Sequence, residues 1–173
     1  MTLRELLTRN KSKILQRWLD LVLDTYPTET ARFLKDEKDR FANPVAFTIK
    51  CNLELLLDDL LNNSSEKTVV LHLEEIIKIR AVQDFSPSQA LSFVWLVKEA
   101  IYSELKVDLK AKEMYSELFK LESEIDRFSG VAFDVYSTCK DLINQIRIKE
   151  LKAENHALNR MLGVQGVKQV RNG

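Results

Sequence analysis

Residues 118–146 read LFKLESEIDRFSGVAFDVYSTCKDLINQI, a stretch with no proline and one glycine, Gly130. Its apolar side chains recur at alternating steps of three and four, the spacing of one face of an α-helix. A lone glycine costs a helix about 1 kcal/mol relative to alanine but does not end it. We therefore predict one long helix from about residue 110 to 162, with this inward face: Leu118, Leu121, Ile125, Phe128, Ala132, Val135, Cys139, Leu142 and Ile146.

The rest of the chain is equally poor in turn residues. Its 173 residues include four glycines and three prolines. Sheets and loops need such residues for unusual backbone angles, so the composition disfavours β-sandwiches, barrels and enzymes with glycine-rich nucleotide loops. Three of the glycines lie close to the C-terminus, and we expect residues 163–173 to be a disordered tail.

Upstream of the long helix, the apolar spacing predicts shorter helices, and the prolines lie at helix boundaries. Thr2 with Glu5 and Ser86 with Gln89 have the spacing of capping boxes, and Asn43 precedes a proline at a first helical position. The sequence thus predicts an all-α helical bundle of five to six helices with a long C-terminal exit helix. The shorter helices are expected near these ranges: 2–26, 28–40, 44–61, 66–83 and 87–105.

The long helix changes its apolar face near its end. After Ile146 the inward pattern fails, and a new one begins that contains a polar Asn155. Asparagine at an a position between leucines at d positions favours a two-stranded coiled coil, so we expect a short parallel dimer seam. The alternative is that this stretch folds back onto its own domain. We therefore divide the chain into a sensory domain (1–147), a helix extension (148–162) and the tail, with this seam: Ile148, Leu151, Asn155, Leu158 and Leu162.

Charge and cysteine usage narrow the function classes. Basic and acidic residues number 26 each, so no net field steers the chain to nucleic acid or to an anionic membrane. No apolar run reaches the roughly 18 residues of a membrane span, and no signal peptide is apparent. Cys51 and Cys139 lie at apolar helical positions, which favours buried free thiols in a reducing cytoplasm.

We find no set of residues that predicts catalysis or a metal site, and we expect neither an enzyme nor a cofactor. There are two histidines, His72 and His156, which is too few for a usual metal set. His72 is a weak candidate for a haem ligand. The acidic pairs Asp58-Asp59 and Glu74-Glu75 are expected to face solvent.

A set of short phrases follows one another along the chain. They are Trp18 with Tyr26-Pro27, Phe41-Ala42-Asn43-Pro44-Val45, Asp84-Phe85-Ser86-Pro87-Ser88-Gln89-Ala90, Ile125-Asp126, Ala132-Phe133-Asp134-Val135-Tyr136, Cys139 and Ile146-Arg147. In their order and spacing, these phrases resemble the N-terminal domain of the RsbRD regulators, which are co-antagonists of the RsbT kinase in bacterial stress signalling. The similarity extends over about residues 5–155.

The resemblance implies a dimeric sensory domain with a globin-like fold that carries no haem. In stressosome-type regulators this domain precedes a STAS domain. No STAS or kinase segment follows here, so the chain is expected to be a stand-alone version that lacks the part the kinase would phosphorylate.

Three functions stay open from the sequence. The first is a cytoplasmic bacterial input module that regulates a signalling protein by direct contact. The second is a helical sensor of haem or another small molecule, and the third is a structural coiled-coil adaptor. A ligand pocket between helices would draw its walls from these aromatic residues: Trp18, Phe93, Trp95, Phe133 and Tyr136.

Overall fold

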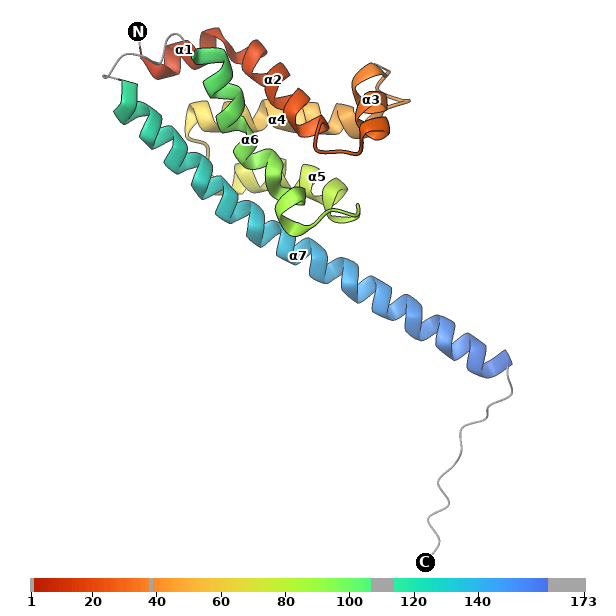
Figure 1. Cartoon of the computed structure of the whole chain (residues 1–173). Coiled ribbons are helices and arrows are strands. Elements are labelled where there is room, and N and C mark those ends of the chain that lie inside the picture. The colour runs from red at the N-terminus through yellow and green to blue at the C-terminus, as the bar shows by residue number, and fades with distance from the viewer. Residues whose placement is uncertain (1, 38, 107–113, 162–173) are drawn as a thin grey trace, which may run out of the picture. The chain divides into compact units, whose positions relative to one another are not determined.

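A computed structural model describes residues 2–37, 39–106 and 114–161, and these residues form an all-helical structure without strands (Figure 1). Seven helices lie within these ranges, so the predicted all-α class is confirmed. The helices are α1 (Leu3–Arg9), α2 (Lys11–Leu23), α3 (Thr28–Asp36), α4 (Pro44–Asn62), α5 (Glu66–Ala81), α6 (Pro87–Leu105) and α7 (Tyr115–Met161).

The predicted first helix, residues 2–26, is two helices, which corrects the expected count of five or six. Asn10 separates them: its side-chain Nδ2 donates to the carbonyl oxygen of Leu6 over 2.9 Å, and its backbone N–H donates to the same oxygen over 3.0 Å. Asparagine side chains compete with the helical ladder in this way, which favours a break at Asn10. Its backbone has φ −102° and ψ 10°.

The predicted helix starts are confirmed by their caps. Thr2 and Glu5 form the expected capping box at α1, and Ser86 and Gln89 form the one at α6. At α4, the Asn43 side chain accepts a hydrogen bond from the backbone N–H of Ala46 over 3.1 Å. Each contact satisfies a backbone donor that the first helical turn leaves without a partner.

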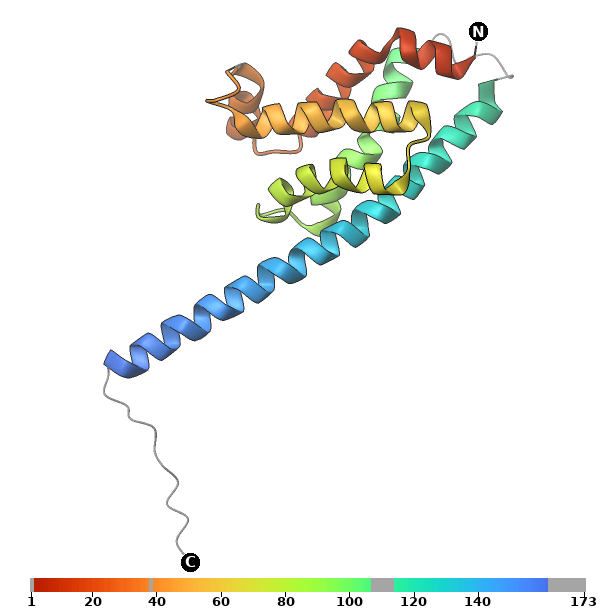
Figure 2. The ribbon, with the colours of Figure 1, turned by 180° about the vertical axis from the view of Figure 1, so that it is seen from behind.

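A tight turn joins α4 to α5. Asn63 lies in the left-handed region, with φ 51° and ψ 51°, which asparagine tolerates better than most residues. Ser65 then caps α5 by accepting from the backbone N–H of Thr68. Because only residues 63–65 separate the two helices, α4 and α5 pack as a hairpin (Figure 2).

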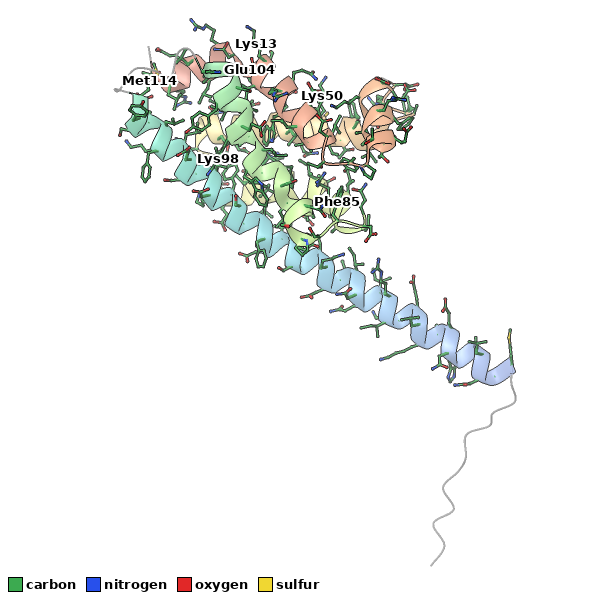
Figure 3. All side chains as sticks on the ribbon, in the orientation of Figure 1. Lys13, Lys50, Phe85, Lys98, Glu104 and Met114 are labelled. Atoms are coloured by element: carbon green, nitrogen blue, oxygen red, sulfur yellow. The ribbon has the colours of Figure 1, made fainter. Side chains whose placement is uncertain are left out.

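The core lies where α2 packs against α6 and α4 against α5. The Trp18 indole N–H of α2 donates to the backbone carbonyl of Phe93 in α6 over 2.7 Å, and both residues are buried. Helix α6 has buried side chains along most of its length, from Ala90 to Leu105. Lys98 of α6, labelled in Figure 3, pairs with Asp126 of α7 over 2.6 Å.

Contacts divide the chain into two units, residues 1–139 and 140–173. In the first unit, the predicted inward face of α7 is buried at Leu118, Ile125, Phe128, Ala132 and Tyr136. The expectation that this face stays buried as far as Ile146 is wrong: in the second unit Leu142 is 58% exposed and Ile146 48%. Helical spacing shows which side chains share a face, but burial requires another element against that face.

Both cysteines are free thiols and are half-buried, which corrects the expectation of full burial. Burial raises the pKa of the Cys139 thiol, and the nearby Glu74 carboxylate adds to the rise. Within the described residues, no helix has the length and apolarity required to cross a bilayer.

Candidate functional site

The predicted seam lies on the second unit, and its apolar side chains are exposed. Ile148 is 51% exposed, Leu151 64% and Leu158 56%, and Asn155 is exposed between the two leucines. Steps of three, four and three place these four residues on one face of α7. Leu162 and the predicted tail 163–173 lie outside the described residues.

This face is an apolar stripe with a single amide in it. None of the described residues from 140 to 161 is buried, so the stripe is accessible in the single chain. Contiguous exposed apolar side chains are typical of surfaces that bind another protein. The arrangement can pack against a second helix, and it contains no nucleophile paired with a base.

The five aromatic residues predicted as pocket walls do not line one common cavity. Trp18, Phe93 and Tyr136 are 2%, 0% and 5% exposed, whereas Trp95 and Phe133 are 40% and 57% exposed. Trp18 and Phe93 are brought together by their hydrogen bond. Trp18 also lines an internal cavity with Ile125 and Phe128, but its volume of about 10 Å³ is smaller than an organic ligand needs.

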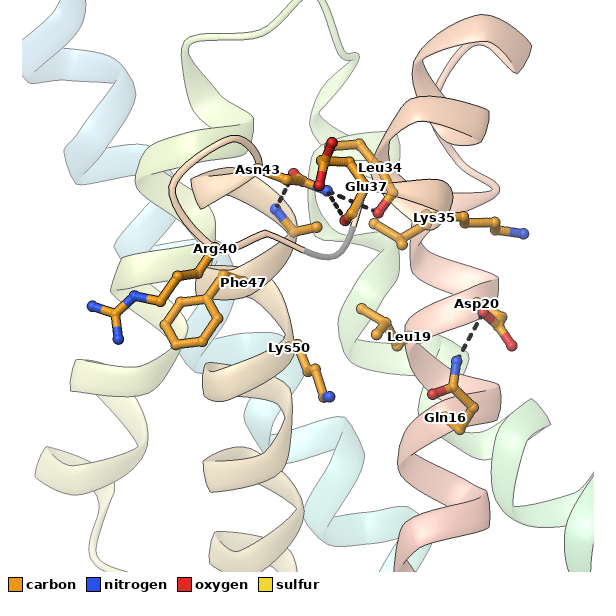
Figure 4. A pocket seen from close by; sticks show the side chains of 12 residues that line it. Gln16, Leu19, Asp20, Leu34, Lys35, Glu37, Arg40, Asn43, Phe47 and Lys50 are labelled. Carbon is orange, nitrogen blue, oxygen red and sulfur yellow. Dashed lines mark hydrogen bonds between the residues drawn. The ribbon is translucent and has the colours of Figure 1, made fainter.

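A larger cleft, of about 160 Å³, opens among α2, α3 and α4 (Figure 4). Asn43 shapes its rim, since its Nδ2 donates to the carbonyl oxygens of Leu34 and Glu37 over 3.0 and 3.1 Å. The charges that line it are mixed in sign: Arg40 precedes α4, Lys50 lies on α4 and Asp20 lies on α2. Such a lining favours neither an anion nor a cation.

His72 pairs with a buried carboxylate. Its Nδ1 lies 2.7 Å from Oδ2 of Asp59, whose side chain is 5% exposed, and the His72 side chain is 19% exposed. The expectation that Asp59 faces solvent is therefore wrong. The imidazole compensates the burial of this carboxylate and ties α4 to α5.

The described residues contain no group of three or more histidine, cysteine, aspartate or glutamate side chains placed to hold a metal ion. His72 and Asp59 form a pair without a third member. Haem ligation by His72 stays a prediction.

One buried charged residue was missed by the sequence analysis. Arg80, near the end of α5, is 0% exposed. It stands three residues after Ile77 and seven after Leu73, both of which are fully buried on the inward face of the helix. The burial of Arg80 could have been predicted from its spacing, because helical periodicity places this cation on the same apolar face as Leu73 and Ile77.

One of the comparisons with known proteins agrees with the phrases noted above. The family model for the RsbT co-antagonist protein rsbRD N-terminal domain matches residues 12–151. No curated protein and no solved structure matches the chain. The suspected resemblance is confirmed because the match covers most of the chain, and this chain belongs to the RsbRD N-terminal domain family, whose members are regulatory domains of stress signalling.

Proposed function

We propose that this chain is a non-catalytic input module of bacterial stress signalling that acts through protein contacts, with residues 148–162 as a homodimer seam. The observation that carries the proposal is the exposed apolar stripe of Ile148, Leu151 and Leu158. A stripe at heptad spacing, exposed in the single chain, is stabilised by packing against a second helix of the same kind.

A continuous helix supports the link between sensing and assembly. α7 runs from Tyr115 to Met161, with buried side chains such as Phe128 in its first part and the seam in its second. A change in the packing of Phe128 acts on the same helix that presents Leu151. An element shared by two sites is what coupling between them requires.

The charges that flank the seam predict that dimerisation depends on salt concentration. With Ile148 at an a position, Arg147 is at g and Lys152 at the following e, the positions that face each other across a parallel dimer. This pair is like-charged, so it opposes association. Because added salt screens exposed charges, the dimer is expected to tighten as ionic strength rises.

The proposal also includes a globin-like fold, a cytoplasmic location, and a role without nucleic-acid binding or catalysis. The all-helical make-up of the described residues supports a globin-like arrangement, and the free thiols of Cys51 and Cys139 support a reducing, cytoplasmic setting. Balanced charge and the lack of a paired nucleophile and base among the sites described above support a role without nucleic-acid binding or catalysis.

Sedimentation equilibrium of the full chain tests the seam. We expect a dimer at roughly 10–100 µM protein, the range in which mass action reports association of moderate affinity. The double variant Leu151→Glu/Leu158→Glu places charges on the stripe and is expected to be monomeric with unchanged helicity. A monomeric wild-type chain across this range contradicts the proposal.

Leu71→Glu is the matched control. Leu71 lies on α5 and is 61% exposed, close to the exposure of Leu151 and Leu158. The same chemical change there is expected to leave the dimer intact. If it dissociates the chain as well, the seam has no special role in assembly.

Contact with a regulated protein is tested by affinity capture from the native lysate. We expect the wild-type chain to recover a signalling partner and the double seam variant to recover less of it. Equal recovery by both would separate partner binding from the seam, and no recovery by either would remove the regulatory part of the proposal.

A further inference from the structure

The guanidinium of Arg80 lies in a dense shell of aromatic rings and oxygen atoms. Its Nε donates to the carbonyl oxygen of Ala90 over 2.8 Å. Its Nη2 donates to the carbonyl oxygen of Gln89 over 2.8 Å and to Oγ1 of Thr25 over 2.9 Å. The residue is 0% exposed, so the charge is removed from water.

Two aromatic faces cover this cation. The guanidinium carbon lies 4.4 Å from the ring centroid of Phe85 and 5.1 Å from that of Tyr26. The two rings meet edge to face, with centroids 5.2 Å apart. These contacts join the Tyr26-Pro27 phrase to the 84–90 phrase, which are far apart in the sequence.

Among the residues that the structure describes, the charge of Arg80 has no carboxylate partner. None of the ion pairs found among the described residues includes Arg80, and burial lowers the pKa of the guanidinium. Buried charges are ordinarily paired, because carbonyl dipoles and ring faces replace lost hydration only in part. An anion is therefore the chemical complement of this position.

Three buried polar atoms around the guanidinium make no hydrogen bond: Nη1 of Arg80, the hydroxyl of Tyr26 and Oε1 of Gln83. Burial raises the pKa of Tyr26, and the charge of Arg80 together with close side-chain contacts to Arg80 and Gln83 opposes that rise. These contacts bring the three groups together, but none has the geometry of a full hydrogen bond. Buried polar atoms are rarely left unsatisfied. Two of these atoms can donate, and the Gln83 amide can donate after a rotation.

A cavity of about 470 Å³ lies against this cluster, beside the turn that Figure 3 marks at Phe85. Tyr26, Gln83 and Phe85 line it, together with Thr25 and Gln89, which both bond Arg80. Tyr26 and Gln83 carry two of the three atoms without a hydrogen bond, and both are part of the cavity wall. Arg80 carries the third atom and lies behind that wall. Its remaining lining residues are Pro27, Thr30 and Asp84.

We propose that this cavity binds a small organic monocarboxylate with an apolar body. The carboxylate accepts hydrogen bonds from Nη1 of Arg80 and from the Tyr26 hydroxyl once the Gln83 side chain rotates aside. The apolar body packs on Phe85 and Pro27. Charge-assisted hydrogen bonds to a planar guanidinium are the interaction best suited to a carboxylate.

Two alternatives fit the observations less well. A single bridging water closes the open hydrogen bonds but leaves the charge of Arg80 without an anion. The carboxylate of Asp84, which also lines the cavity, repels a phosphate dianion more strongly than a monocarboxylate, and phosphate has no apolar part to pack on Phe85 and Pro27. The proposal uses only residues 25–90, so it stands or falls independently of the dimer seam.

Titration of the full chain with phenylacetate tests the site, with neutral phenylacetamide and inorganic phosphate as matched probes. The readouts are calorimetry and the NMR signal of the Arg80 Nε–H. The ring currents of Phe85 and Tyr26 are expected to shift this signal away from those of the other arginines. For a ligand of this size we expect a dissociation constant of about 1 mM for phenylacetate and at least about tenfold weaker binding of the other two probes.

Tyr26→Phe removes one proposed donor and keeps the ring. We expect it to weaken phenylacetate binding about tenfold, the usual effect of losing a hydrogen bond to a charged group. Tyr102→Phe is the control, because that hydroxyl donates to Glu122 over 2.7 Å and is not part of the cavity wall. It is expected to bind phenylacetate as the wild type does.

Three results overturn the proposal. One is a folded wild-type chain whose Arg80 signal responds to no probe, which leaves a bridging water as the partner. Another is phosphate binding tighter than phenylacetate. The third is equal phenylacetate affinity in wild type and in folded Tyr26→Phe; Gln83→Leu, which removes the rotating amide from the site, gives a second reading if Tyr26→Phe does not fold.

Discussion

Helix α7 has two apolar stripes with the same helical spacing, of which one is buried and the other is exposed. In residues 1–139, Ile125, Phe128 and Tyr136 are 1%, 3% and 5% exposed. In residues 140–173, Ile148 and Leu158 are 51% and 56% exposed. The difference teaches that helical spacing assigns a face, whereas burial depends on the element that covers it.

The largest expected effect comes from damage to the buried stripe. Phe128→Ala removes a ring that lines the small internal cavity beside Trp18. We expect the free energy of unfolding to fall by about 3–5 kcal/mol, because the vacated space can collapse only in part. Urea denaturation followed by circular dichroism measures it.

Phe133→Ala is the matched change on the same helix. Phe133 is 57% exposed, so its loss is expected to cost about 0.5 kcal/mol or less. Equal losses in the two variants would show that the described burial does not decide the stability of α7.

A smaller effect is expected at the polar position of the exposed stripe. Asn155→Leu removes an amide that lowers the stability of a two-stranded seam, so the dimer is expected to tighten by about tenfold or more. Sedimentation equilibrium gives the dissociation constant. An unchanged or weaker dimer would remove Asn155 from the interface.

Gly130 offers a further test, within the first part of α7. A Cβ added there meets nothing within 4 Å. Gly130→Ala is therefore expected to raise the free energy of unfolding by about 0.5–1 kcal/mol through its better helix propensity. Thermal and urea unfolding measure the gain, and a loss would indicate a contact at this position.

Ala132→Gly is the reverse change two residues further on. Ala132 is 0% exposed, so the variant loses helix propensity and a buried methyl group together. We expect a destabilisation larger than the Gly130→Ala gain.

The smallest expected effect is a difference in alkaline stability. Burial raises the pKa of Tyr26 above its ordinary value of 10.0. As pH rises past 10.0, the hydroxyl of Tyr26 loses its proton in the unfolded chain before it does so in the folded chain. The contribution of this group to the free energy of unfolding is therefore fully present below pH 10.0 and is lost as pH rises through the folded-state pKa. Tyr26→Phe is expected to lose less stability in this range than the wild type.

Tyr102→Phe is the control variant for the alkaline-stability measurement. The hydrogen bond to Glu122 is the main cause that raises the pKa of Tyr102, and this side chain is 43% exposed. Solvent screens an exposed pair, so its removal is expected to change the alkaline slope less than Tyr26→Phe does. Urea midpoints measured from about pH 8 to about pH 11 compare the two.

The helices were largely predictable because their signals are local. Capping boxes at Thr2 and Ser86, the Asn43 cap and the spacing from Leu118 to Tyr136 all act within a few residues of the chain. The break at Asn10 was also local but was missed, since an asparagine within a helical pattern bonds its own backbone only in some contexts.

The candidate sites were predictable only in part. The exposed seam followed from a change of helical phase after Ile146. The pairing of His72 with Asp59 and the enclosure of Arg80 did not, since each joins residues from different helices. A charged residue on an apolar face indicates that a partner is needed but does not identify it.

The sequence by itself determined the helical class, most helix boundaries and the two faces of α7, because these depend on hydrogen bonds and spacing within four residues. The tertiary structure alone decided which face is covered and which charges are buried. It placed Tyr26, Arg80 and Phe85 in contact across more than fifty residues of chain. Burial and pairing are properties of contacts between distant segments, and no local pattern encodes them.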